Sequence, residues 1–446
     1  MRKFLIPLVA AGVAASVAGV AGGATPAPVT VALPHPTGPQ PVGTTELHFT
    51  DQHRADPWVP SQKRQIMASA WYPARDVARY PLAHQFLPGA AAVFGKAAAD
   101  SHHVPVGTVD WSATTTSGHV GAPPAPGRHP LVLYSAGLGD PRGWGTTITQ
   151  ELASRGYVVL TIDHTYEASA VEFPDGRVAD NSAMLEEFQK TGDPIAILKK
   201  IMRARLQDDE YVLDHLPAGI SRMIDPRHIG FLGHSGGGFE GLQLLHDDPR
   251  ISAAADLDGI VGWDENDTGP GLSQLAREGV DKPFLLMGSS TNDHYTSTSW
   301  GALWKHSHGW HRDVHLRGSE HASYTDAEAL IPRIAAQRKL PAQATADIGW
   351  IDPDRARLIQ RTYLAAFFDQ WLRGRPTGVF EHDRFPEASV LRPEFPPLPA
   401  ARSRRLASLS SVDVTPSRLP PPPRDASACI TASSGKLRAQ HTSLVP

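Results

Sequence analysis

The amino-acid sequence predicts an α/β protein in which a mostly parallel central sheet is covered by helices on both faces. Two observations carry this prediction. Continuous apolar runs of strand length recur along the chain, for example at residues 131–137 and 157–164, and such runs are typical of strands buried on both faces. Helical patterns separate the runs, for example at residues 195–216, and this alternation indicates parallel strands joined by helices.

The other elements follow in chain order. Two β-like runs, at residues 46–50 and 65–73, precede a loop-rich region that extends to residue 129. Further strands are predicted at residues 229–235, 251–259, 283–289 and 313–319, and further helices at residues 144–155, 236–245 and 355–372. The predicted helices carry apolar residues at helical spacing, which indicates that one face of each packs on the sheet.

The two ends of the chain differ from this central part. Residues 1–24 begin with Arg2 and Lys3, continue as a run of small apolar residues and end in small residues. This is the layout of a secretory signal peptide, so we expect a secreted, extracellular protein, with an uncleaved membrane anchor as the alternative. Residues 25–42 predict a flexible spacer, residues 43–376 one large domain, and residues 377–446 a disordered tail rich in Pro, Arg and Ser.

Charge and cysteine content exclude some classes of partner and linkage. The formal net charge is −4, so there is no broad electrostatic reason to expect a nucleic-acid partner. The single cysteine, Cys429, cannot form an internal disulfide, and stability must come from a packed core. No oligomeric state is predicted.

The stretch FLGHSGGGFE, residues 231–240, places Ser235 among glycines directly between a predicted strand and a predicted helix. This is the G-x-S-x-G nucleophile elbow in its required context. The sharp turn forces strained backbone at the serine and exposes its hydroxyl, and small residues are needed where strand and helix approach closely. We expect the neighbouring His234 side chain to point away from Ser235.

A serine hydroxyl needs a base and an orienting acid before it can act as a nucleophile. His321 is the candidate base because it follows the last predicted strand, where this motif places it. Two aspartates compete as the acid: Asp258 ends the strand after the serine helix, and Asp293 follows the next strand. The pattern by itself favours Asp293 slightly. Histidines at residues 306–315 lack the carboxylate or cysteine pattern of a zinc site, so no metal is expected.

The tetrahedral oxygen formed during acyl transfer requires two backbone N–H donors. Gly236, directly after the serine, is the first candidate. Leu138 is the second, because it follows the strand at residues 131–137 and is flanked by glycines. A Gly-Leu-Gly sequence alone is a common turn, so this signal depends on the serine motif.

Several segments together resemble the α/β-hydrolases related to plasma-type platelet-activating factor acetylhydrolase and their secreted bacterial relatives. They include HPLVLYSAGLGDPRGWG, RLQDDEYVLDHL, IGFLGHSGGG, AADLDG and GSEHASYTD, and the likeness spans roughly residues 46–374. The resemblance implies an α/β-hydrolase fold. It also implies Ser235 as nucleophile, Asp258 as acid in its Leu-Asp context, His321 as base, and Leu138 and Gly236 as oxyanion donors. One position departs from the family, which commonly has histidine where this chain has Ala136.

The resemblance implies a secreted serine ester hydrolase that acts on a short acyl ester of a phospholipid without a cofactor. Its substrate would be a small-molecule or lipid ester, and transient contact with a lipid surface is expected. The alternatives are a general carboxylesterase, a cutinase-like polyester hydrolase and, in another class, a non-catalytic binding protein of the same fold. A complete set of Ser, Asp and His argues against the binding protein, since binding does not require all three.

Overall fold

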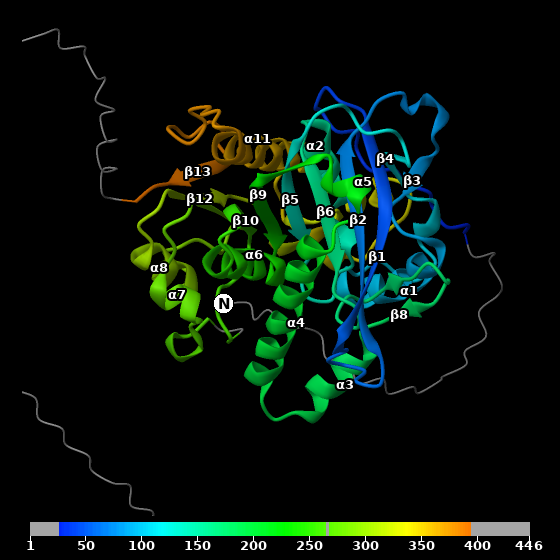
Figure 1. Ribbon diagram of the computed structural model, residues 1–446, viewed down its shortest axis with the longest axis horizontal. Coiled ribbons are helices and arrows are strands. Elements are labelled where there is room, and N and C mark those ends of the chain that lie inside the picture. Colours follow the sequence, from blue (N-terminus) through cyan, green and yellow to red (C-terminus); the bar gives the residue numbers. More distant parts are fainter. Residues whose placement is uncertain (1–25, 265–266, 394–446) are drawn as a thin grey trace, which may run out of the picture. The chain divides into compact units, whose positions relative to one another are not determined.

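A computed structural model describes residues 26–264 and 267–393 of the chain (Figure 1). Eleven strands of this part form one sheet in the order β13-β12-β11-β10-β9-β5-β6-β2-β1-β4-β3. Their bounds are β1 (Val42–Ala55), β2 (Lys63–Pro73), β3 (Leu82–His84), β4 (Thr115–Val120), β5 (His129–Ser135), β6 (Val158–Asp163), β9 (Ile224–His234), β10 (Ile251–Leu257), β11 (Phe284–Gly288), β12 (His311–Leu316) and β13 (Ala388–Leu391). A separate small hairpin joins β7 (Val171–Glu172) to β8 (Val178–Ala179).

The centre of the sheet is parallel and its margins are mainly antiparallel. Neighbouring strands from β12 through β11, β10, β9 and β5 to β6 are parallel, whereas β13, β2 and β3 join their neighbours in antiparallel register. The predicted fold class is therefore confirmed.

Helices cover both faces of this sheet (Figure 1). The helices are α1 (Pro88–Ser101), α2 (Thr146–Ser154), α3 (Ser182–Lys190), α4 (Pro194–Asp214), α5 (Ala218–Ser221), α6 (Gly236–Asp247), α7 (Gln274–Glu278), α8 (Thr298–His306), α9 (Ala327–Ala335), α10 (Ala342–Ala346) and α11 (Pro353–Arg373), with a short 3-10 turn η5 (His321–Tyr324). Among the described residues, no helix combines the length and the apolar character that a membrane crossing needs.

The alternation of side chains along the strands builds two cores. On β5, Leu131 and Leu133 belong to the core that α4, α6 and α8 help to cover, whereas Val132 and Tyr134 belong to the core that α2 and α11 help to cover on the opposite face. Successive strand residues point to opposite faces, so a run that is apolar throughout is buried on both sides. This is the physical basis of the strand pattern seen in the sequence.

The segment predicted as a flexible spacer is packed in the structure from residue 26 onward. Val29, Val31 and Leu33 are buried at alternate positions, and their backbone forms bridges to the chain at Val109 and Thr115. The expectation rested on composition, but a two-residue alternation of Val and Leu supports an edge segment even in a proline-rich stretch.

The predicted start of the disordered tail, at residue 377, is also too early in the chain. Residues 377–393 contain β13, which pairs antiparallel with β12, and Val379, Phe380, Ala388 and Val390 are buried. The short Ala388–Leu391 run alternates in burial, and pairing with β12 satisfies its backbone groups. The predicted signal peptide at residues 1–24 and the tail beyond residue 393 lie outside the described residues.

Candidate active site

Ser235 lies at the sharp turn between β9 and α6, where the glycine-rich motif places it. Its backbone angles are φ 55° and ψ −121°, and a positive φ is uncommon for a residue with a side chain. A Cβ on Gly233 would collide with the backbone of Gly237, and a Cβ on Gly237 would collide with the carbonyl of Ser135. The glycines therefore permit the close approach of strand, helix and neighbouring loop, and Ser235 stays partly exposed at the end of the strand.

The predicted acid Asp258 pairs directly with the predicted base His321. Asp258 follows β10 and its Oδ2 lies 2.7 Å from Nδ1 of His321. The other carboxylate oxygen accepts hydrogen bonds from the backbone N–H of Ser289 at 2.7 Å and from the side-chain amide of Asn292 at 3.1 Å. The Asp258 side chain is 3% exposed and that of His321 is 34% exposed, so a buried, fully bonded carboxylate orients an accessible imidazole.

This pairing changes the acidity of His321. Burial disfavours the charged imidazolium, but the hydrogen bond and the negative charge of Asp258 outweigh burial and raise the pKa of His321 above the ordinary histidine value. Asp140 and Glu320 act in the same direction through their charges. The imidazole is therefore a stronger base than a free histidine.

Ser235 and His321 lie at the same edge of the sheet, where the parallel strands end. The His234 ring lies 4.5 Å from the His321 ring, centroid to centroid, and its Nε2 donates to the carbonyl oxygen of His321 at 3.1 Å. A Cβ on Gly137 would lie 3.1 Å from His234 Nδ1 and 3.3 Å from Ser235 Cβ. The His234 ring therefore packs against the η5 turn that carries His321, and the expectation that its side chain points away from Ser235 stays a prediction. Burial and the neighbouring His321 charge lower the pKa of His234, which keeps it neutral.

The two predicted oxyanion donors also meet. A Cβ on Gly236 would lie 2.8 Å from Leu138 Cγ and 3.6 Å from the Leu138 backbone nitrogen. Gly236 is the first residue of α6, and the first N–H groups of a helix have no acceptor within the helix. Among the described residues, the Leu138 N–H also has no hydrogen-bond acceptor. The backbone N–H groups of Gly236 and Leu138 therefore lie close together beside Ser235.

Asp293, the alternative acid, has a different environment. Its Oδ1 accepts hydrogen bonds from the backbone N–H groups of Tyr295 at 2.9 Å and Thr296 at 2.8 Å. Its carboxylate therefore caps its own turn, whereas the carboxylate of Asp258 contacts His321.

A buried charged cluster beneath the Leu138 loop was not found by sequence reasoning. It combines Arg205 and Asp209 of α4 with Glu240 of α6 and with His164 and Glu167 of the loop after β6. Its signal in the sequence is the charged run RLQDDE at residues 205–210. Without knowledge of which helix face meets the sheet, that run is indistinguishable from an exposed polar face.

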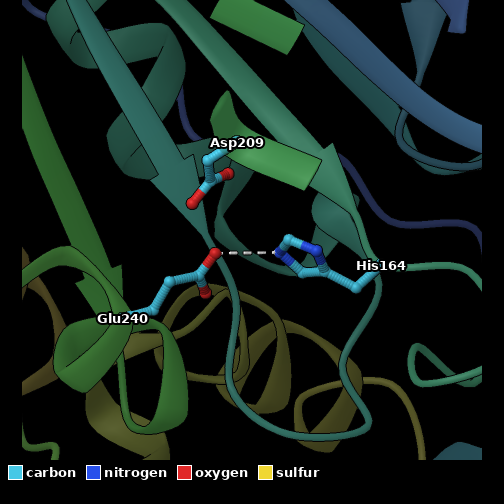
Figure 2. Close-up of side chains that lie close together, drawn as sticks. All are labelled: His164, Asp209 and Glu240. Atoms are coloured by element: carbon cyan, nitrogen blue, oxygen red, sulfur yellow. Dashed lines mark ion pairs between the residues drawn. The ribbon is translucent and has the colours of Figure 1, made fainter. Parts of the chain in front are cut away.

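Three members of this cluster, His164, Asp209 and Glu240, present ligand atoms within 4.8 Å of one another (Figure 2). The ionisation of these side chains favours binding of protons and not of a metal ion. The His164 Nδ1 lies 3.1 Å from Asp208 and its Nε2 lies 3.1 Å from Glu240. Burial opposes the charged ring, but these carboxylates raise the pKa of His164 to about 9, so neither ring nitrogen offers a lone pair at neutral pH. Burial and the adjacent Glu240 charge raise the pKa of Asp209, which favours its protonated form.

Comparison with known proteins shows which families the chain resembles. The family model described as platelet-activating factor acetylhydrolase, isoform II, matches residues 27–191. A probable 1-alkyl-2-acetylglycerophosphocholine esterase of Arthroderma benhamiae is 28% identical over 387 residues, which cover 82% of this chain and 95% of that relative. The platelet-activating factor acetylhydrolase of Cavia porcellus is 24% identical over 250 residues, 51% of this chain and 55% of that relative.

A solved structure extends the likeness to three dimensions. A ferulic acid esterase from Streptomyces cinnamoneus superposes with a TM-score of 0.67 at 32% identity, covering 81% of this chain and 99% of that one. These relatives are all named as hydrolases of carboxylic esters. The chain therefore belongs to the α/β-hydrolase family, resembles the platelet-activating factor acetylhydrolases within it, and is a carboxylic ester hydrolase.

Proposed function

We propose that Ser235, His321 and Asp258 form the catalytic triad of a secreted esterase that cleaves short acyl esters, with acetylated phospholipids as its substrate class. The observation that carries this proposal is the 2.7 Å hydrogen bond between His321 Nδ1 and buried Asp258 beside the Ser235 turn. The substrate class is supported by the matched family model and by the names of the two curated relatives. Secretion is supported by the sequence pattern of residues 1–24.

The geometry supports an acyl-enzyme mechanism. Because Nδ1 of His321 donates its hydrogen to Asp258, Nε2 carries the lone pair that accepts the Ser235 proton. The serine oxygen then attacks the ester carbonyl, and the N–H groups of Leu138 and Gly236 bind the oxygen that becomes negative. His321 returns the proton to the departing alcohol. Water, deprotonated by His321, then attacks the acyl-enzyme, and the acid is released as Ser235 regains its proton from His321.

A general carboxylesterase is the second candidate, because the solved structure at 32% identity is named a ferulic acid esterase. A substrate panel separates the two functions. We expect an acetylated phospholipid to be cleaved with a higher kcat/KM than its long-chain diacyl counterpart and than methyl ferulate. A preference for methyl ferulate would favour the general esterase. Failure of a fluorophosphonate probe to label the folded protein would favour a non-catalytic binding protein.

The raised pKa of His321 predicts the pH dependence of hydrolysis. His321 must be neutral to accept a proton, so kcat/KM falls as the pH drops through its raised pKa, and the midpoint of this acid limb lies above the ordinary histidine value. Asp140→Asn removes one negative charge that raises this pKa and shifts the midpoint to lower pH. Asp225→Asn, at the opposite end of β9, leaves it unchanged. pH profiles of the three proteins check this, and an unshifted midpoint in Asp140→Asn contradicts it.

A further inference from the structure

Arg205 of α4 is a buried cation whose guanidinium lies directly behind the loop that carries Leu138. Its side chain is 2% exposed. Two carboxylates hold its charge: Glu167 contacts it at 2.6 and 2.7 Å, and Glu240 at 2.8 Å. Burial by itself would disfavour the charged guanidinium, and these two partners stabilise it.

The same guanidinium donates three hydrogen bonds to the last residue of β5 and to the loop that follows it. Nη1 donates to Ser135 Oγ at 3.0 Å and to the carbonyl oxygen of Ala136 at 3.0 Å, and Nη2 donates to the carbonyl oxygen of Gly137 at 3.3 Å. The Gly137 carbonyl belongs to the same peptide unit as the Leu138 N–H, and the Ala136 carbonyl belongs to the unit before it. Their orientation fixes the plane of the Gly137–Leu138 peptide, and with it the direction of the Leu138 N–H.

Arg205 also connects this loop to the helix that begins at the serine turn. Glu240 lies in the second turn of α6, whose first residue is Gly236. Through Glu240, Arg205 links the helix that carries one oxyanion donor to the loop that carries the other. Directly after Leu138 in the chain, the Gly139 N–H donates to Glu167 Oε1 at 3.3 Å, so the backbone before and after Leu138 is held by Arg205 and its partner Glu167.

We propose that Arg205 is a positioning residue that sets the separation and direction of the two oxyanion donors, Leu138 and Gly236; this inference rests on the proposed function. Ala136 contributes only its backbone, and Arg205 supports that backbone from the buried side.

Lysine cannot replace this arginine. A guanidinium offers five N–H donors in a fixed plane, whereas an ammonium is a point charge with three rotatable donors. Arg205→Lys keeps the positive charge near Glu167 and Glu240 but cannot also reach both carbonyls. We expect kcat for p-nitrophenyl acetate to fall about 10- to 100-fold, which is the loss expected from a donor displaced by about 1 Å. We expect KM to stay within about twofold, because the oxyanion contact strengthens in the transition state.

Arg64→Lys is the matched control. Arg64 is equally buried, at 0% exposure, and contacts Asp56 and Asp208 of the adjacent charged group, but it makes no hydrogen bond to residues 135–139. The Arg64→Lys substitution should lower the thermal midpoint of unfolding about as much as Arg205→Lys does, and it should leave kcat close to the wild-type value. The affinity for a boronic acid, which mimics the tetrahedral state, should weaken in Arg205→Lys in parallel with kcat and stay unchanged in Arg64→Lys.

Two results would overturn the inference. One is a folded Arg205→Lys enzyme with the kcat and boronate affinity of Arg64→Lys. If Arg205→Lys does not fold, Glu167→Gln decides: it keeps Arg205 and loosens its anchoring, so kcat should fall several-fold, and an unchanged kcat would overturn the proposal. Ser235→Ala in the same assay separates a failure of the proposed function from a failure of the role proposed for Arg205. An active Ser235→Ala enzyme refutes the proposed function, whereas an inactive one beside a fully active Arg205→Lys enzyme refutes only the role of Arg205.

Discussion

Ser235→Ala is expected to lower kcat for a short acyl ester by roughly 10⁵- to 10⁶-fold, the loss that follows removal of a triad nucleophile in serine hydrolases. Without the hydroxyl no acyl-enzyme forms, and only the oxyanion donors and substrate binding remain. Steady-state rates on p-nitrophenyl acetate measure this loss, and a fluorophosphonate probe should label the wild type but not the variant.

Two controls show that such a loss of kcat comes from the missing hydroxyl and not from a change in folding. Ser235 already has a positive φ, so alanine at this position meets the same backbone strain as serine, and the thermal midpoint should change by no more than a few degrees. Ser252→Ala, a partly buried serine of β10, should retain wild-type turnover and labelling. Turnover of Ser235→Ala at the wild-type rate would show that this serine is not the nucleophile.

Asp258→Asn is expected to lower kcat by about 10⁴-fold, as seen when the acid of a serine triad becomes an amide. The carboxylate accepts the Nδ1 hydrogen of His321 and so keeps the Nε2 lone pair available to Ser235. An asparagine that donates its amide hydrogen to Nδ1 favours the other tautomer, in which Nε2 is already protonated. kcat of the folded variant, with the pH profile, measures the effect.

Asp293→Asn is the paired experiment, because Asp293 was the other candidate acid. Its Oδ1 accepts two backbone N–H groups of its own turn, and an asparagine side-chain oxygen can keep these bonds. We expect kcat within about threefold of wild type, since no bond to the triad is lost. A severe loss in Asp293→Asn with normal activity in Asp258→Asn would reverse the assignment of the acid.

The strands and helices near the site could be predicted because their signals are local. The run at residues 131–137 became β5 and the helix at 195–216 became α4, since burial on two faces or on one helical face imposes a pattern over a few residues. The glycines around Ser235 were equally informative, because a Cβ on Gly233 or Gly237 would collide with nearby backbone. Residues 26–42 and β13 were missed because their alternation is short and their composition is typical of disorder.

The amino-acid sequence by itself determined the fold class, the turn at Ser235 and the short set of residues from which a site could be built. Local steric rules and hydrophobic periodicity act within a few residues, so they can be read along one chain. Only the tertiary structure decided that His321 pairs with Asp258 and not Asp293, and that Arg205 lies behind Leu138. Those contacts join residues far apart in the chain, and they depend on strand order and on which helix face meets the sheet.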